Sequence, residues 1–153
     1  DGATEAALGA ATRQLDSKDW RERSAGLRAL GDLKTVLHTL PESQVALLLD
    51  SITNRLSDGN SKVNVLALET VESILPSLGN AVGVGLNTLI PALSANAAST
   101  NEKIRSKAVD AMDALVASVD GALLVQNLSH VISHGSARSK AVMIERLEAV
   151  VRN

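Results

Sequence analysis

The sequence contains no cysteine, no phenylalanine and no tyrosine, and only one tryptophan. The lack of cysteine excludes disulfide scaffolds, thiol nucleophiles and zinc sites with sulfur ligands. β-Sandwiches and barrels use aromatic and β-branched residues heavily, so the scarcity of aromatics argues against them. The same scarcity excludes nucleic-acid sites that stack bases on several aromatic side chains.

Charge and hydropathy exclude further classes of protein. The 153 residues carry a formal net charge of -2, so bulk electrostatics would not drive binding to nucleic acid. No uninterrupted apolar run comes near the length of a membrane-spanning helix, about 20 residues, and no secretory signal opens the chain. We therefore expect no nucleic-acid partner and no membrane partner. Because the first residue is Asp1 and not methionine, we expect the chain to be a fragment of a larger multidomain protein.

Four segments share one pattern. In each, a polar loop is followed by a basic residue, and an apolar helical stripe begins five positions after that residue. The basic residues are Arg21, Lys62, Lys103 and Arg138, so the first two intervals are equal and the third is slightly shorter. A period of about 40 residues is typical of paired-helix repeats of the HEAT or armadillo kind.

The stretches between these segments supply the first helix of each pair. The clearest has apolar residues at helical spacing over 45–56, and no segment alternates with the period of two that a half-buried strand requires. The sequence therefore predicts an all-α fold without a sheet, an α-solenoid of about eight helices in four HEAT-like pairs. We expect a single domain over 1–153, with repeats at roughly 3–40, 41–79, 82–119 and 121–153.

Signals of catalysis and of metal or cofactor binding are weak throughout. His130 and His134 are spaced i, i+4, but Val131 stands where the corresponding helix of zinc hydrolases carries glutamate, and no third ligand is evident. Two surface or helix-end histidines are the interpretation that we favour. The glycine-rich stretch 79–85 lacks phosphate-loop spacing, and no serine lies in a G-x-S-x-G motif. We predict no catalytic, cofactor-binding or metal-binding residue, and no enzyme.

The four basic residues share a position that helix stability disfavours. Each is expected in the first turn of the second helix of its pair, where the helix dipole makes a cation unfavourable by about 0.3–1 kcal/mol. Equivalent loops of a solenoid line one edge, so these residues form a basic row that a partner could use. Two structural alternatives remain. One is coverage of apolar surface by the side-chain stems; the other is an ion-pair ladder between repeats, drawn from Arg23, Arg105, Asp19, Asp58 and Asp110.

The one aromatic residue lies at a junction between loop and helix. Trp20 stands between Asp19 and Arg21, outside every apolar stripe. An exposed tryptophan beside arginine is typical of an interface hot spot. We therefore predict that Trp20 contacts a partner and that its removal leaves stability almost unchanged. The alternative is an indole that folds back as an end cap over the first helix pair.

The segment 19–23 has the pattern D-W-x-x-R and is followed by Gly26, Leu27 and Leu30. This loop and helix resemble the opening repeat of a TOG domain, a tubulin-binding HEAT array found in microtubule polymerases, CLASP proteins and crescerin proteins. The segments 58–63, 101–105 and 136–140 are similar to the following repeat loops, so the resemblance covers essentially the whole chain. TOG domains usually have six repeats, whereas this sequence predicts four. The scarcity of aromatics leaves the subfamily open, with the crescerin type favoured.

The resemblance implies a non-enzymatic module that binds the tubulin heterodimer or the microtubule and regulates microtubule dynamics. It assigns tubulin binding to Trp20, Arg21, Lys62, Lys103, Arg138 and Lys140. Trp20 would pack against β-tubulin, and Arg138 and Lys140 would begin the half that faces α-tubulin. It further implies a monomeric module without cofactor, located in the cytoplasm on the cytoskeleton, with the cilium or centrosome as candidate sites. The alternative function is a generic HEAT scaffold whose concave surface holds a helix or peptide of a protein partner.

Overall fold

The computed structural model describes residues 2–134, 141, 144–145 and 148, with side chains up to residue 127 in the continuous part. This part of the chain is helical and contains no strand, as predicted. Its elements are α1 (Gly2–Leu15), α2 (Trp20–Asp32), η1 (Leu37–Thr39), α3 (Glu42–Arg55), α4 (Ser61–Leu78), η2 (Gly79–Gly85), α5 (Leu86–Ala97), α6 (Glu102–Ser118) and α7 (Gly121–His134). The described residues thus hold seven α-helices, and the eighth helix that the sequence predicts lies largely outside them.

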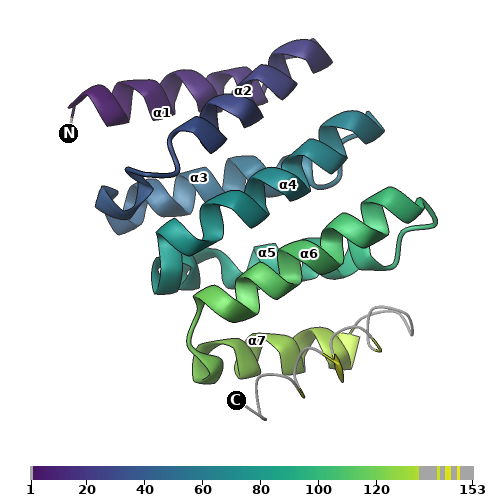
Figure 1. The fold of residues 1–153 in the computed structure, drawn as a ribbon. Helices are drawn as coiled ribbons and strands as arrows, with labels where there is room; N and C mark the ends of the chain where they lie inside the picture. The colour runs from purple at the N-terminus through teal and green to yellow at the C-terminus, as the bar shows by residue number, and fades with distance from the viewer. Residues whose placement is uncertain (1, 135–140, 142–143, 146–147, 149–153) are drawn as a thin grey trace.

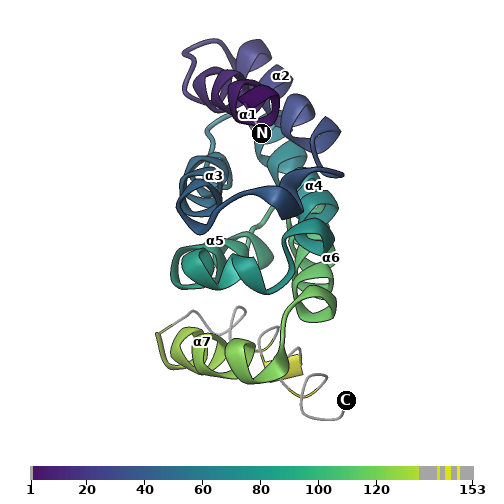
Figure 2. The ribbon, with the colours of Figure 1, turned by 90° about the vertical axis from the view of Figure 1, so that its left-hand side faces the viewer.

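The helices form two layers. One layer contains α1, α3, α5 and α7, and the other contains α2, α4 and α6 (Figure 2). Successive helix pairs stack side by side along one direction, from α1 and α2 at one end to α7 at the other (Figure 1). This arrangement confirms the predicted α-solenoid.

The core lies between the layers because each helix turns one apolar stripe inward. On α3 the stripe is Val45, Leu48, Leu49 and Ile52, and all four side chains are at most 1% exposed. Leu68 on α4 is fully buried against the same cluster. The predicted helical spacing is therefore also the spacing of buried residues.

One segment in the middle of the chain is unusually apolar. Within Ser61–Ala97, a window of 18 residues has a mean hydropathy of 1.2, as apolar as a membrane-spanning helix. The structure divides this segment into α4, η2 and α5, and 44% of the apolar window is buried inside the fold. Core helices meet the same criterion, so this hydropathy is weak evidence for a membrane span.

The first helix pair is held at close range by Gly26. A Cβ atom at this position would lie 2.8 Å from the carbonyl oxygen of Ala11 and 2.9 Å from Cβ of Gln14, both on α1. We expect Gly26→Ala to lower the free energy of unfolding by about 1–3 kcal/mol, because α1 and α2 must move apart. Gly31→Ala is the matched control, since a Cβ there meets nothing within 4 Å and alanine favours the helix by about 0.5–1 kcal/mol. Urea denaturation of both variants measures the difference, and equal effects would contradict the close packing.

Candidate functional site

The three described loops within helix pairs lie along one side of the stack, one loop from each successive pair, and are built alike (Figure 1). They span 16–19, 56–60 and 98–101 and end at equally spaced helix N-caps, Asp19, Asn60 and Asn101. We call this side of the molecule the loop edge. The sequence placed the same loops at 16–19, 57–61 and 97–101, within one residue of the observed limits, because their Asp, Asn and Ser residues cap helices.

Each N-cap also fixes the position of a basic residue. The cap oxygen accepts a hydrogen bond from the backbone N–H two residues further on, at 2.9 Å from Arg21, 2.9 Å from Lys62 and 3.0 Å from Lys103. All three basic residues are therefore the second residue of α2, α4 and α6, and all three are exposed. Arg138 and Lys140 lie outside the described residues.

Two further sets of hydrogen bonds recur with the repeat and were not predicted from the sequence, which named Arg23, Arg105 and Asp58 only as candidates for the ladder. The N-cap N–H groups donate to Ser17 at 3.1 Å, to Asp58 at 2.9 Å and to Ser99 at 3.1 Å. Further along, Arg23 and Arg105 each donate from Nη1 to the carbonyl oxygen six residues earlier, at 3.0 Å. Both sets brace the loops against their helices. Their recurrence in step with the N-caps was the signal that could have revealed them.

Asp58 joins the first two repeats. Its carboxylate accepts hydrogen bonds from Nε of Arg23 at 2.9 Å and from Nη1 of Arg55 at 2.9 Å, and its side chain is 2% exposed. Burial raises the pKa of Asp58, but hydrogen bonds from Arg23 and the Asn60 backbone, with the charges of Arg23 and Arg55, hold the pKa below its ordinary value. The ladder that the sequence offered as an alternative thus exists between Arg23 and Asp58.

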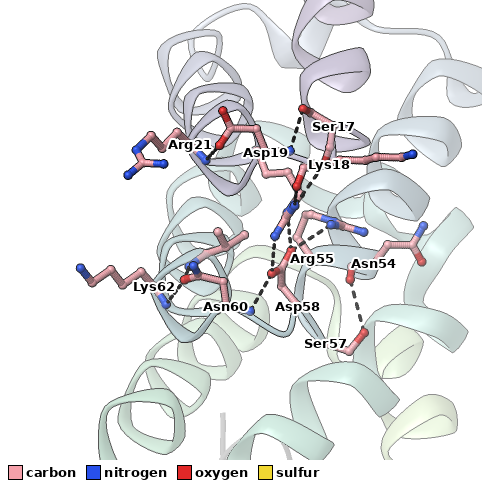
Figure 3. Close-up of polar contacts among 12 residues, drawn as sticks. Ser17, Lys18, Asp19, Arg21, Asn54, Arg55, Ser57, Asp58, Asn60 and Lys62 are labelled. Atoms are coloured by element: carbon pink, nitrogen blue, oxygen red, sulfur yellow. Dashed lines mark hydrogen bonds and ion pairs between the residues drawn. The ribbon is translucent and has the colours of Figure 1, made fainter.

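The ion pairs of the ladder do not involve the described residues of the basic row. Arg21 and Lys62 extend outward to the same side of the loop edge, away from the network around Asp58 (Figure 3). The two ion pairs resolved among the described residues join Asp58 to Arg23 and to Arg55, and neither involves the row. The ladder therefore accounts for Arg23 and not for the three exposed cations.

Trp20 lies differently from both sequence-based expectations. Its side chain is partly buried and packs against the hydrophobic core, so it does not stand clear of the apolar residues. It is not an end cap either, because Nζ of Lys62, from the second repeat, lies 5.8 Å from the ring centroid. Cζ of Arg21 lies 4.8 Å from the same centroid. Both distances suit cation–π contacts, so the indole bridges the first two repeats between two cations.

Trp20, Lys62 and Lys103 meet in one hollow. They line a concavity of about 410 Å³ that lies between α2 and α4 and reaches the start of α6. We call it the α2–α4 groove. It brings together an apolar ring and two cations from three successive repeats, an arrangement suited to a partner with apolar and acidic groups side by side.

The chemistry of the described residues offers no metal centre. Within the part of the chain whose side chains are resolved, no three potential ligands among His, Cys, Asp and Glu gather. His130 and His134 belong to α7, but their side chains lie outside the resolved set.

Known proteins resemble this chain in two ways: some are similar in sequence, and others share only its fold. The chain is 33% identical over 141 residues to TOG array regulator of axonemal microtubules protein 1 of Homo sapiens, and equally to that of Mus musculus. Each match covers 92% of this chain and 8% of the relative, so the chain spans a small part of the proteins it resembles. No family model matches.

The fold itself is that of helical repeat proteins. A designed armadillo repeat protein superposes with a TM-score of 0.62 at 15% identity, over 95% of this chain and 69% of that one. An engineered protein of the Northeast Structural Genomics Consortium superposes with a TM-score of 0.61 at 14% identity, over 95% of this chain and 62% of that one. At such identities the likeness concerns the fold alone. The sequence relationship confirms the resemblance to TOG array proteins.

Proposed function

We propose that this TOG-like chain binds tubulin, as the heterodimer or in the microtubule, through its loop edge and without catalysing a reaction. The observation that carries the proposal is the convergence of Trp20, Lys62 and Lys103 in the α2–α4 groove. The similarity to proteins named as regulators of axonemal microtubules supports the choice of partner.

The physical basis is an apolar anchor surrounded by exposed charge. A partly buried tryptophan loses little conformational freedom on binding, and tryptophan is among the residues most enriched at interface hot spots. The exposed cations at Arg21, Lys62 and Lys103 would attract an acidic protein surface and speed its association. Arg138 and Lys140 extend this surface in the proposal, on the half that would face α-tubulin.

The wider setting of the chain is part of the same proposal. We place it as one monomeric domain of four repeats, 3–40, 41–79, 82–119 and 121–153, within a longer protein. It would act on microtubules in the cytoplasm, with the cilium and the centrosome as specific sites. It would need no cofactor.

Charge reversal at Lys103 tests the electrostatic part of the proposal. Lys62 is the poorer choice, because it also contacts the Trp20 ring. We expect Lys103→Glu to slow association with tubulin about tenfold at low salt, with a smaller effect at physiological salt, where the Debye length is about 8 Å. An acidic residue in the first turn of α6 favours the helix, so loss of binding would not reflect unfolding.

The control is Lys34→Glu, the same change at an exposed lysine beyond the far end of α2 from the loop edge. Biolayer interferometry on immobilised tubulin at two salt concentrations gives both association rates. Equal slowing by the two reversals would refute a specific role for the loop edge, as would binding that does not depend on salt.

A further inference from the structure

The α2–α4 groove continues along the helices beyond the loop edge. On α2 it is lined by Trp20, Ser24 and Arg28, which follow one another at four-residue steps on one face of the helix. Eight residues of α-helix rise about 12 Å. An extended chain advances about 3.3 Å per residue, so the groove matches three or four residues of an extended segment.

The floor and the rim of the groove differ in chemistry. Ser24 is 4% exposed and Val65 is 8% exposed, so small and apolar side chains line the floor between the helices. The exposed residues Arg28, Lys62 and Lys103 surround this floor. None of the three forms an ion pair with a described carboxylate, although Lys62 lies over the Trp20 ring and Glu69 lines the same groove.

Among the three described repeats, a basic residue at the position of Arg28 occurs only in the first. Arg28, Glu69 and Asp110 occupy equivalent positions of three successive repeats, each the same distance along the chain from the N-cap before it. Between α4 and α6 the positions equivalent to Arg28 and Glu69 are therefore both acidic, although Lys103 and Lys107 also lie on that face of α6, whereas the α2–α4 groove combines Arg28 with the single glutamate Glu69. A ligand with several carboxylates would be attracted more strongly to the first groove than to the corresponding face of the next pair.

We infer that the α2–α4 groove binds an extended acidic segment, three or four residues long, of a protein partner. An apolar side chain of this segment lies over Val65 beside Trp20, and flanking carboxylates reach Arg28, Lys62 and Lys103. The volume of about 410 Å³ is in the range of sites that hold a few side chains. The inference deepens the proposed function and rests on it for a protein partner with an acidic surface.

The single tryptophan makes binding directly measurable. Trp20 is the only tryptophan of the chain and lines the groove, so its fluorescence reports on this site. The probe is a blocked pentapeptide of four glutamates around a central leucine, and its counterpart replaces the glutamates with lysines. We expect a saturable fluorescence change with the acidic peptide and none with the basic one.

Arg28→Glu is the decisive variant, because Arg28 lies in the groove two helical turns from the loop edge. It should weaken binding of the acidic peptide about tenfold, whereas Arg13→Glu, the same change at an exposed arginine on α1, should alter it less than about twofold. Glu69→Lys should tighten binding, and Asp50→Lys, on α3, should not.

Equal effects of Arg28→Glu and Arg13→Glu would overturn the inference, since net charge alone would then explain binding. A response to the basic peptide would overturn it as well. These results are separable from the proposed function. If tubulin fails to bind while the acidic peptide binds as expected, the inference stands and the tubulin proposal fails. If tubulin binds through the loop edge while the peptide does not bind, the tubulin proposal stands and the inference of an acidic segment fails.

Discussion

Trp20→Ala is expected to weaken the binding of tubulin about thirtyfold, which corresponds to ~2 kcal/mol of binding free energy. The indole lies between Arg21 and Lys62, so its removal deletes the apolar anchor and also the surface that orders these two cations. Co-elution with tubulin and a titration by biolayer interferometry measure the loss.

The same substitution should lower stability moderately, contrary to the expectation from the sequence. Because Trp20 packs against the core while remaining partly exposed, we expect a loss of about 1–2 kcal/mol in the free energy of unfolding, less than a fully buried tryptophan would cost. Binding must therefore be compared at a temperature where both proteins are folded.

Leu47→Ala is the matched control, since Leu47 is a large apolar residue that is 61% exposed on α3, in the other layer. It should bind tubulin as the unmodified chain does. If Trp20→Ala also bound like the unmodified chain, the tubulin proposal would lose its most specific residue.

A second large effect is expected at Asp58. Asp58→Ala should lower the free energy of unfolding by about 3 kcal/mol, because it leaves Arg23 and Arg55 without their carboxylate in a largely buried site. For a chain of this size the melting temperature should fall by about 6–12 °C. Asp50→Ala, at an exposed position of α3, should change stability by less than about 0.5 kcal/mol.

The contribution of Asp58 should also depend on pH in a defined direction. Its pKa in the folded chain lies below the ordinary value, about 3.9, so its stabilising effect is present above that value. The effect is lost as the pH falls towards the lower pKa of the folded state. Urea denaturation at neutral pH and near pH 3 should therefore give a smaller difference between the unmodified chain and Asp58→Ala at the lower pH. A difference that stays constant would show that Asp58 acts through packing instead of charge.

Much of the architecture can be predicted from local signals. Helix periodicity, the loops rich in Ser, Asp and Asn, and the regular recurrence of these loops together predict the helix pairs and the placement of Arg21, Lys62 and Lys103 at the starts of helices. These features depend on residues within a few positions of one another. Local propensity and capping decide them, so they can be read from one chain.

The resemblance to a TOG repeat also depended on a local motif, the D-W-x-x-R segment at 19–23. What this motif does within the fold was harder to predict. The sequence left Arg23 open between a ladder and other roles, and it placed Trp20 outside the core.

The sequence by itself determined that this protein is a stack of helix pairs with a basic residue at the start of each second helix in the described repeats. Only the tertiary structure decided which residues of neighbouring repeats meet. It placed Lys62 against the Trp20 ring, joined Arg23 to Asp58 of the next repeat, and opened the α2–α4 groove beside Arg28. The physical reason is that such contacts depend on the distance and rotation between adjacent helix pairs. The packing of the whole core sets this distance and rotation, and no short segment encodes them.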